Sequence, residues 1–247
     1  IGRHLFMHEE ATFKEIDLTG ARIGGQLGMD GSTFDGLLTM DGTEIGENLF
    51  ARFTRFSTDQ ELILYFSRIG SSLDLCGATI GAIDLTGATI TGELRLGSAQ
   101  TQQPTNWGEA SRMVLRNTTV GAIQDADVMT DSWPEYLELE GFTYHRLGGF
   151  GAMGAADIAK RNREWFIQWL ERDRTFSPQP YEQLAIMLSR SGYPAKANAI
   201  RYAARKRSRR TALERNDGKP REWLRWIGLT LLQLTIGYGL GARYFRV

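Results

Sequence analysis

The 247-residue sequence has very few of the residues from which disulfides and metal centres are built. Its one cysteine, Cys76, excludes both an internal disulfide and a zinc site made of cysteines. Three histidines leave little other capacity for a metal, because His4 and His8 lie four residues apart without an apparent third ligand. A single cysteine also fits a reducing compartment better than a small, disulfide-rich secreted fold.

Net charge is absent as well, because 29 basic and 29 acidic residues cancel. This balance conceals a division of the chain. Residues 1–150 hold 10 Lys and Arg against 21 Asp and Glu, a net charge of −11, whereas residues 151–247 hold 19 against 8, a net charge of +11. Such asymmetry indicates two parts with different partners. No basic region followed by an apolar run opens the sequence, so no signal peptide is expected, and the first residue, Ile1, suggests a fragment.

A repeat of about eleven residues runs from residue 12 to residue 97. Each unit reads apolar-x-apolar, and a single Ile or Phe follows after four more residues. A spacing of two is typical of a short strand whose flanking side chains share one face, whereas a helix needs spacings of three and four. The residues expected to form an interior ladder are Leu18, Ile23, Met29, Phe34, Met40, Ile45, Leu75, Ile80, Leu85 and Ile90.

Strands this short, held at a fixed phase, predict a solenoid. Each strand would pair with the equivalent strand of the next coil, about 4.8 Å away, and neighbouring coils would bury the apolar ladders. Recurring glycines would take corner conformations that other residues resist. Weaker repeats extend the expected domain to residues 1–147, and the polar stretches 98–112 and 124–135 are expected to be loops inserted at coil corners.

The repeat resembles that of a known family. Segments such as Ala21-Arg22-Ile23-Gly24 resemble the pentapeptide-repeat pattern of a small, a polar and an apolar residue followed by two free ones, although many steps here have a sixth residue. The resemblance implies a mainly β N-terminal domain with a right-handed quadrilateral β-helix. Some members of that family mimic duplex DNA and bind type II topoisomerases. The acidic first half permits this function, but the basic second half would cancel its field.

Apolar spacing becomes helical at about residue 155. The region 155–215 therefore predicts an α-helical C-terminal module, in which a turn at Gly192-Tyr193-Pro194 separates two helices. That pair resembles a tetratricopeptide-type hairpin. The last helix continues into a basic run. The run is open to three interpretations: a solvated helix face, a nucleic-acid site and a lipid site. The absence of interleaved aromatic residues argues against nucleic acid.

An apolar segment follows the basic run, within residues 219–247. Its fourteen mostly apolar residues, 223–236, are too few to span a bilayer, which takes about 20, but they are typical of an interfacial helix. Cations beside such a helix attract anionic lipids by about 1 kcal/mol each and favour the cytoplasmic side of the membrane. A buried terminal helix is the alternative. The expected membrane-proximal residues are Arg205, Lys206, Arg207, Arg209, Arg210, Trp223 and Trp226.

A second resemblance supports the membrane interpretation. Residues 178–185, the basic run and residues 235–239 together resemble a bacterial membrane-anchored family in which a degenerate β-helix precedes this module. The resemblance implies a membrane-spanning helix beyond Val247. Members of that family often carry the label "membrane-associated oxidoreductase", which would imply NAD(P) or flavin.

Two short motifs suggest chemistry that their surroundings do not support. A GxGxxG string at 149–154 lacks the alternating strands and helices of a dinucleotide-binding fold, so we expect a hinge there. The string at 235–239 matches a potassium-channel filter, but no spanning segment precedes it. No nucleophile elbow, catalytic carboxylate pair or phosphate loop is apparent. We therefore expect a non-enzymatic, cofactor-free, membrane-associated scaffold that binds a partner protein; a DNA mimic and an oxidoreductase are the alternatives.

Overall fold

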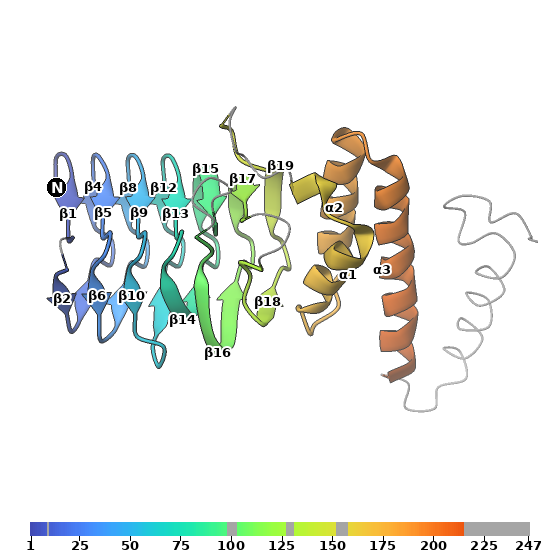
Figure 1. Cartoon of the computed structure of the whole chain (residues 1–247), viewed down its shortest axis with the longest axis horizontal. Helices are drawn as coiled ribbons and strands as arrows, with labels where there is room; N and C mark the ends of the chain where they lie inside the picture. Colours follow the sequence, from blue (N-terminus) through green and yellow to red (C-terminus); the bar gives the residue numbers. More distant parts are fainter. Residues whose placement is uncertain (9, 98–102, 127–130, 152–157, 215–247) are drawn as a thin grey trace, which may run out of the picture. The chain divides into compact units, whose positions relative to one another are not determined.

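A computed structural model gives the fold of five stretches: residues 1–8, 10–97, 103–126, 131–151 and 158–214. The chain divides into two units, and Figure 1 shows the elements of each. The first, Ile1–Arg161 with Arg172–Arg174, is a parallel β-solenoid of about six turns within residues 5–147. The second comprises Asn162–Glu171 and the chain from Thr175, and its described part is helical. This confirms the predicted fold class, a mainly β solenoid followed by an α-helical module.

The solenoid strands form two sheets, and every strand pair in them is parallel. The first sheet contains β1 (Leu5–Phe6), β4 (Arg22–Ile23), β5 (Leu27–Gly28), β8 (Glu44–Ile45), β9 (Leu49–Phe50), β12 (Arg68–Ile69), β13 (Leu73–Asp74), β15 (Thr89–Arg95), β17 (Thr119–Gln124) and β19 (Thr143–Leu147). The second contains β2 (Thr12–Phe13), β3 (Ile16–Asp17), β6 (Thr33–Phe34), β7 (Leu38–Thr39), β10 (Arg55–Phe56), β11 (Glu61–Ile63), β14 (Thr79–Asp84), β16 (Asn106–Val114) and β18 (Tyr136–Glu138).

The pairing register shows how the sequence repeat builds a coil. The first coil joins the second through four parallel ladders, in which β1 pairs with β5, β2 with β6, β3 with β7 and β4 with β8. Leu5 lies opposite Leu27, and Leu27 lies opposite Leu49, so these coils advance by 22 residues. One coil therefore contains two of the eleven-residue units.

The apolar positions of the repeat form the core. Of the ten residues expected in the interior ladder, Leu18 is half-buried and the other nine are at most 3% exposed. Phe13, Phe34 and Phe56 stack along one interior row, with ring centroids 5.1 and 5.4 Å apart. Stacked rings add to the stabilisation that burial of apolar area gives each coil.

Small polar residues hold the coil corners together from inside. The buried hydroxyl of Ser32 donates to the carbonyl of Met7 at 2.7 Å, and the hydroxyl of Thr54 donates to that of Met29 at the same distance. Each bond satisfies a buried hydroxyl and joins one coil to the next; the Met29 carbonyl also accepts the N–H of Ser32 at 3.2 Å. Ser32 and Thr54 lie two places before Phe34 and Phe56 of the repeat, and this spacing alone does not reveal their bonding role.

One of the two expected loops ends in a strand. β16 occupies Asn106–Val114, so it includes the second part of the segment 98–112, and it pairs with β14 and β18. Its outward side chains are polar because that face meets solvent, and this polarity gave the segment the composition of a loop. In the other expected loop, 124–135, Trp133 is only 5% exposed, so the described part of this loop packs against the solenoid.

The helical unit has a short first helix and a hairpin. Its elements are α1 (Arg163–Glu171), α2 (Pro178–Arg190) and α3 (Pro194–Glu214), and the 3₁₀ helix η1 (Ile158–Lys160) precedes them in the solenoid unit. α2 and α3 pack closely through fully buried residues such as Leu184, Leu188 and Ile200. Gly192, with φ +87°, makes the turn between them, where a side chain would be strained.

Candidate functional site

Several ion pairs on the outer surface of the solenoid join successive coils. On one face, Glu44 accepts from Arg22 at 3.1 Å and from Arg68 at 3.0 Å, so one carboxylate bridges three coils. On another face, Asp30 pairs with Arg52 of the next coil. Because Arg22 and Arg68 are mostly exposed, solvent screens the first network and each of its pairs contributes about 0–1 kcal/mol.

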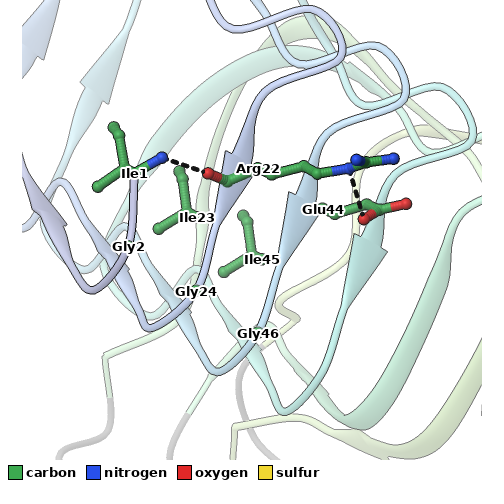
Figure 2. Close-up of a pocket in the computed structure, with 8 residues that line it drawn as sticks. All are labelled: Ile1, Gly2, Arg22, Ile23, Gly24, Glu44, Ile45 and Gly46. Atoms are coloured by element: carbon green, nitrogen blue, oxygen red, sulfur yellow. Dashed lines mark hydrogen bonds and ion pairs between the residues drawn. The ribbon is translucent and has the colours of Figure 1, made fainter.

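A shallow hollow of about 440 Å³ lies beside Arg22 and Glu44 (Figure 2). Its floor is backbone, because glycines occupy one corner of successive coils: a Cβ on Gly46 would lie 2.3 Å from the carbonyl oxygen of Gly24. The amino group of Ile1 donates to the carbonyl of Arg22 at 2.8 Å. Arg22 and Glu44 are thus paired with each other, and Ile23 and Ile45 are buried, so the hollow offers a ligand mainly backbone and the side chain of Ile1.

A second hollow, of about 460 Å³, has aromatic walls. Phe6, Gly28 and Phe50 stand in register on the outward side of β1, β5 and β9. Phe6 is 51% exposed and stacks on His4, with ring centroids 5.7 Å apart. The other lining residues are His8, Gln26, Asp30 and Arg52. We call this hollow the aromatic groove.

Two further phenylalanines occupy corners where other coils have glycine. Phe53 has φ +58° and Phe66 has φ +51°, and they are 53% and 66% exposed. A Cβ on Gly77 would lie 2.6 Å from the ring of Phe53, so each ring partly covers the backbone of the next coil; Phe66 covers Gly87 in the same way. A left-handed conformation costs a residue with a side chain about 1–2 kcal/mol. Phe53 and Phe66 thus have strained backbone conformations and largely exposed rings at coil corners.

A buried ion pair lies at the C-terminal end of the solenoid. Nη2 of Arg161 is 2.9 Å from Oδ2 of Asp125, and the two side chains are 3% and 0% exposed. Asp125 also accepts from the indole N–H of Trp133 at 3.0 Å and from the backbone N–H of Ala126 at 2.7 Å. Burial raises the pKa of Asp125, and the charge of Arg161 opposes this shift. The pair fixes the loop after β17 to the segment at η1.

The start of the GxGxxG string is bound to the solenoid. The N–H of Phe150 donates to the carboxylate of Glu93, which is 1% exposed and also pairs with Arg95. A Cβ on Gly149 would lie 2.8 Å from the amide oxygen of Gln124 and 3.0 Å from a Glu93 oxygen. A nucleotide phosphate at this position would be repelled by the Glu93 carboxylate. The N–H of Phe150, which would have to bind the phosphate, already donates to Glu93. Residues 152–154 lie outside the described residues.

The single cysteine, Cys76, is buried in the solenoid. Cys76 is 6% exposed, and both burial and the nearby Asp74 carboxylate raise the pKa of its thiol. Its thiolate, the nucleophilic form, is therefore disfavoured. His4 accepts a hydrogen bond from the N–H of Gln26 at 3.0 Å. Within the described ranges, no group of three potential ligands could hold a metal ion.

The packing of α3 against α2 buries one residue of the basic run and leaves others exposed. Arg207 is only 8% exposed, and it donates to the carbonyl of Leu170 and to the hydroxyl of Tyr181, both at 3.0 Å. Arg207 is therefore a packing residue of the helical unit, so its guanidinium is not exposed as the others of the expected membrane-proximal set are. Arg205, Lys206 and Arg210 are exposed, and Arg209 is half-buried. Trp223 and Trp226 lie outside the described residues.

Comparisons with protein-family models, with curated proteins and with solved structures found no match for this chain. The solenoid is consistent with the pentapeptide-repeat-like fold that the sequence predicts. The resemblance to the membrane-anchored family, and with it the oxidoreductase label, stays a prediction. Among the residues that the structure describes, no helix is long and apolar enough to cross a membrane.

Proposed function

We propose that this chain is a non-enzymatic scaffold that attaches to the cytoplasmic side of a membrane through its basic helical end and binds a partner protein through its solenoid. The observation that carries the proposal is the pair of strained, exposed rings, Phe53 and Phe66. Aromatic side chains are enriched among the residues that dominate protein–protein binding. Each ring also covers the backbone of the next coil, and more than half of each residue stays exposed to a partner.

The ion-pair ladders favour a protein partner over DNA mimicry. A DNA mimic needs rows of unneutralised acidic charge that imitate phosphates. Here Glu44 lies between Arg22 and Arg68, and Asp30 is paired with Arg52, so arginines interrupt the acidic rows on these two faces. Mixed charge around exposed aromatic residues is the composition of a protein-binding surface.

Photo-crosslinking in cells tests the partner half of this proposal. Placing p-benzoylphenylalanine at position 53 or 66 of the native chain is expected to give a covalent adduct with the same protein, because both rings face outward and the substitute is also aromatic. The matched control position is Thr89, which is exposed on a solenoid strand. Adducts are identified by mass spectrometry. Labelling from positions 53 and 66 that is no different from that at position 89 would contradict the proposal.

Sedimentation with lipid vesicles tests the membrane half. Replacing Arg205, Lys206 and Arg210 with glutamine is expected to weaken binding of the full chain to phosphatidylglycerol vesicles about 100-fold, since each cation near an anionic surface contributes about 1 kcal/mol. Glutamine is a good helix former, so α3 should persist. The control replaces three exposed solenoid arginines, Arg22, Arg55 and Arg68, and should leave binding unchanged. Equal binding to phosphatidylcholine vesicles would refute the idea.

A further inference from the structure

Among the described strands, β18 is the last of the second sheet, and no following coil pairs with its edge. In this sheet Leu64, Leu85 and Leu115 occupy the same place in three successive coils, and each donates its backbone N–H to a carbonyl of the next coil at 2.8 or 2.9 Å. Leu139 has this place in the coil of β18. Its N–H group therefore needs an acceptor from outside the ladder, because an unpaired buried N–H is costly.

Three residues between α1 and α2, Arg172–Arg174, supply the missing acceptors. The carboxylate of Asp173 accepts the N–H of Leu139 at 2.9 Å, and the carbonyl of Arg172 accepts that of Leu137 at 3.2 Å. Both leucines are at most 1% exposed, and Asp173 is 6% exposed, so water does not compete for these bonds. A side-chain carboxylate thus takes the place that a backbone carbonyl has in the earlier coils. We call Arg172–Arg174 the edge cap.

The two arginines of the edge cap anchor it to the solenoid. Nη1 of Arg172 donates to the carbonyl of Trp133 at 2.9 Å, and the same guanidinium pairs with Asp131. The guanidinium carbon of Arg174 lies 3.8 Å from the centroid of the Tyr136 ring, which belongs to β18. All three residues of the edge cap therefore contact β18 or the segments beside it, and they belong to the solenoid unit although helices flank them in the sequence.

An uncovered strand edge is a template for pairing with another chain, so natural proteins cover or charge such edges. We infer that the edge cap prevents a second copy of this chain from pairing with β18. Without the edge cap, the β18 edges of two copies would meet about a two-fold axis and exchange N–H···O=C bonds, because each edge presents both donors and acceptors. This inference goes beyond the proposed scaffold role and does not depend on it.

Amide hydrogen exchange of the ¹⁵N-labelled full chain, followed by NMR, measures the cap itself. Asp173→Ala is expected to speed exchange of the Leu139 amide about 10–100-fold, the range that corresponds to loss of a hydrogen bond to a charged group. Asp173→Asn keeps a side-chain oxygen as acceptor, so exchange should rise less. The Leu64 amide, bonded in the same way three coils earlier, is the internal reference and should not change in either variant.

Sedimentation velocity over a range of concentrations measures pairing. The double variant Arg172→Ala/Asp173→Ala is expected to gain a concentration-dependent dimerisation step that the native chain lacks. Adding Tyr136→Lys should abolish this step, because a lysine on an edge strand opposes pairing. Asp59→Ala is the matched control: it removes a carboxylate from an exposed position outside the strands, so this variant should sediment like the native chain.

Three results would overturn the inference. Unchanged exchange of the Leu139 amide in Asp173→Ala would show that the carboxylate does not cap the edge. Faster exchange without association would show that the uncapped edge does not pair, and association that survives Tyr136→Lys would place the contact elsewhere. Should Asp173→Ala also lose protection at Leu64, the same measurements are made on Arg172→Ala, which keeps the carboxylate and removes only its anchor.

Discussion

Replacing Arg161 with methionine is expected to lower the free energy of unfolding of the solenoid unit by about 3–5 kcal/mol. The reason is the negative charge of Asp125, which would remain buried after Arg161 is removed. Asp125 is 0% exposed and lies 2.9 Å from Arg161, so the variant would leave a buried carboxylate without its cation. The hydrogen bonds from Trp133 and Ala126 offset only part of its desolvation.

Urea unfolding followed by far-ultraviolet circular dichroism measures this loss. Arg22→Met is the matched control: the side chain of Arg22 is 81% exposed and pairs with Glu44 in solvent, so its removal should cost no more than about 1 kcal/mol. The double variant Asp125→Asn/Arg161→Met should recover most of the stability, because it removes both charges and keeps an acceptor for Trp133. If Arg161→Met unfolds within 1 kcal/mol of the native chain, the buried pair does not hold this end of the solenoid.

Leu38→Asp is expected to prevent the solenoid from folding. Leu38 is 2% exposed and lies opposite Ile16 on the interior side of β7. The substitution loses about 2–5 kcal/mol of leucine packing and also places a carboxylate inside an apolar ladder. Together these costs are comparable with the whole stability of a typical domain, about 5–15 kcal/mol.

The neighbouring residue provides the control for this variant. Leu37 is half-buried just before β7, so Leu37→Asp introduces the same charge where water can reach it, and the β signal should persist. Loss of the strand spectrum and of amide dispersion in Leu38→Asp alone is the expected outcome. A melting curve for Leu38→Asp that overlays that of the native chain would show that this register is wrong.

Sequence spacing was sufficient to predict the solenoid and its inward-facing residues. Leu27 and Met29 flank one residue, and Phe34 follows at a fixed distance, so the alternation of strand side chains decides which of them point inward. This information is local, because it depends only on positions within one eleven-residue unit. Composition, by contrast, misled at β16, because its solvent-facing polar side chains gave the segment the appearance of a loop.

The candidate sites depend on distances along the chain that no local pattern records. Phe6 and Phe50 are walls of one groove only because the coils advance by 22 residues there and bring Gly28 between them. Asp125 forms an ion pair with Arg161, which lies 36 residues later in the chain. Arg207 looks like every other cation in its run, and only the packing of α3 buries it beside Tyr181. The sequence by itself determined which residues face the core, because strand alternation is a property of neighbours. Tertiary structure alone decided which polar and aromatic side chains meet, because coil stacking and helix packing set those contacts.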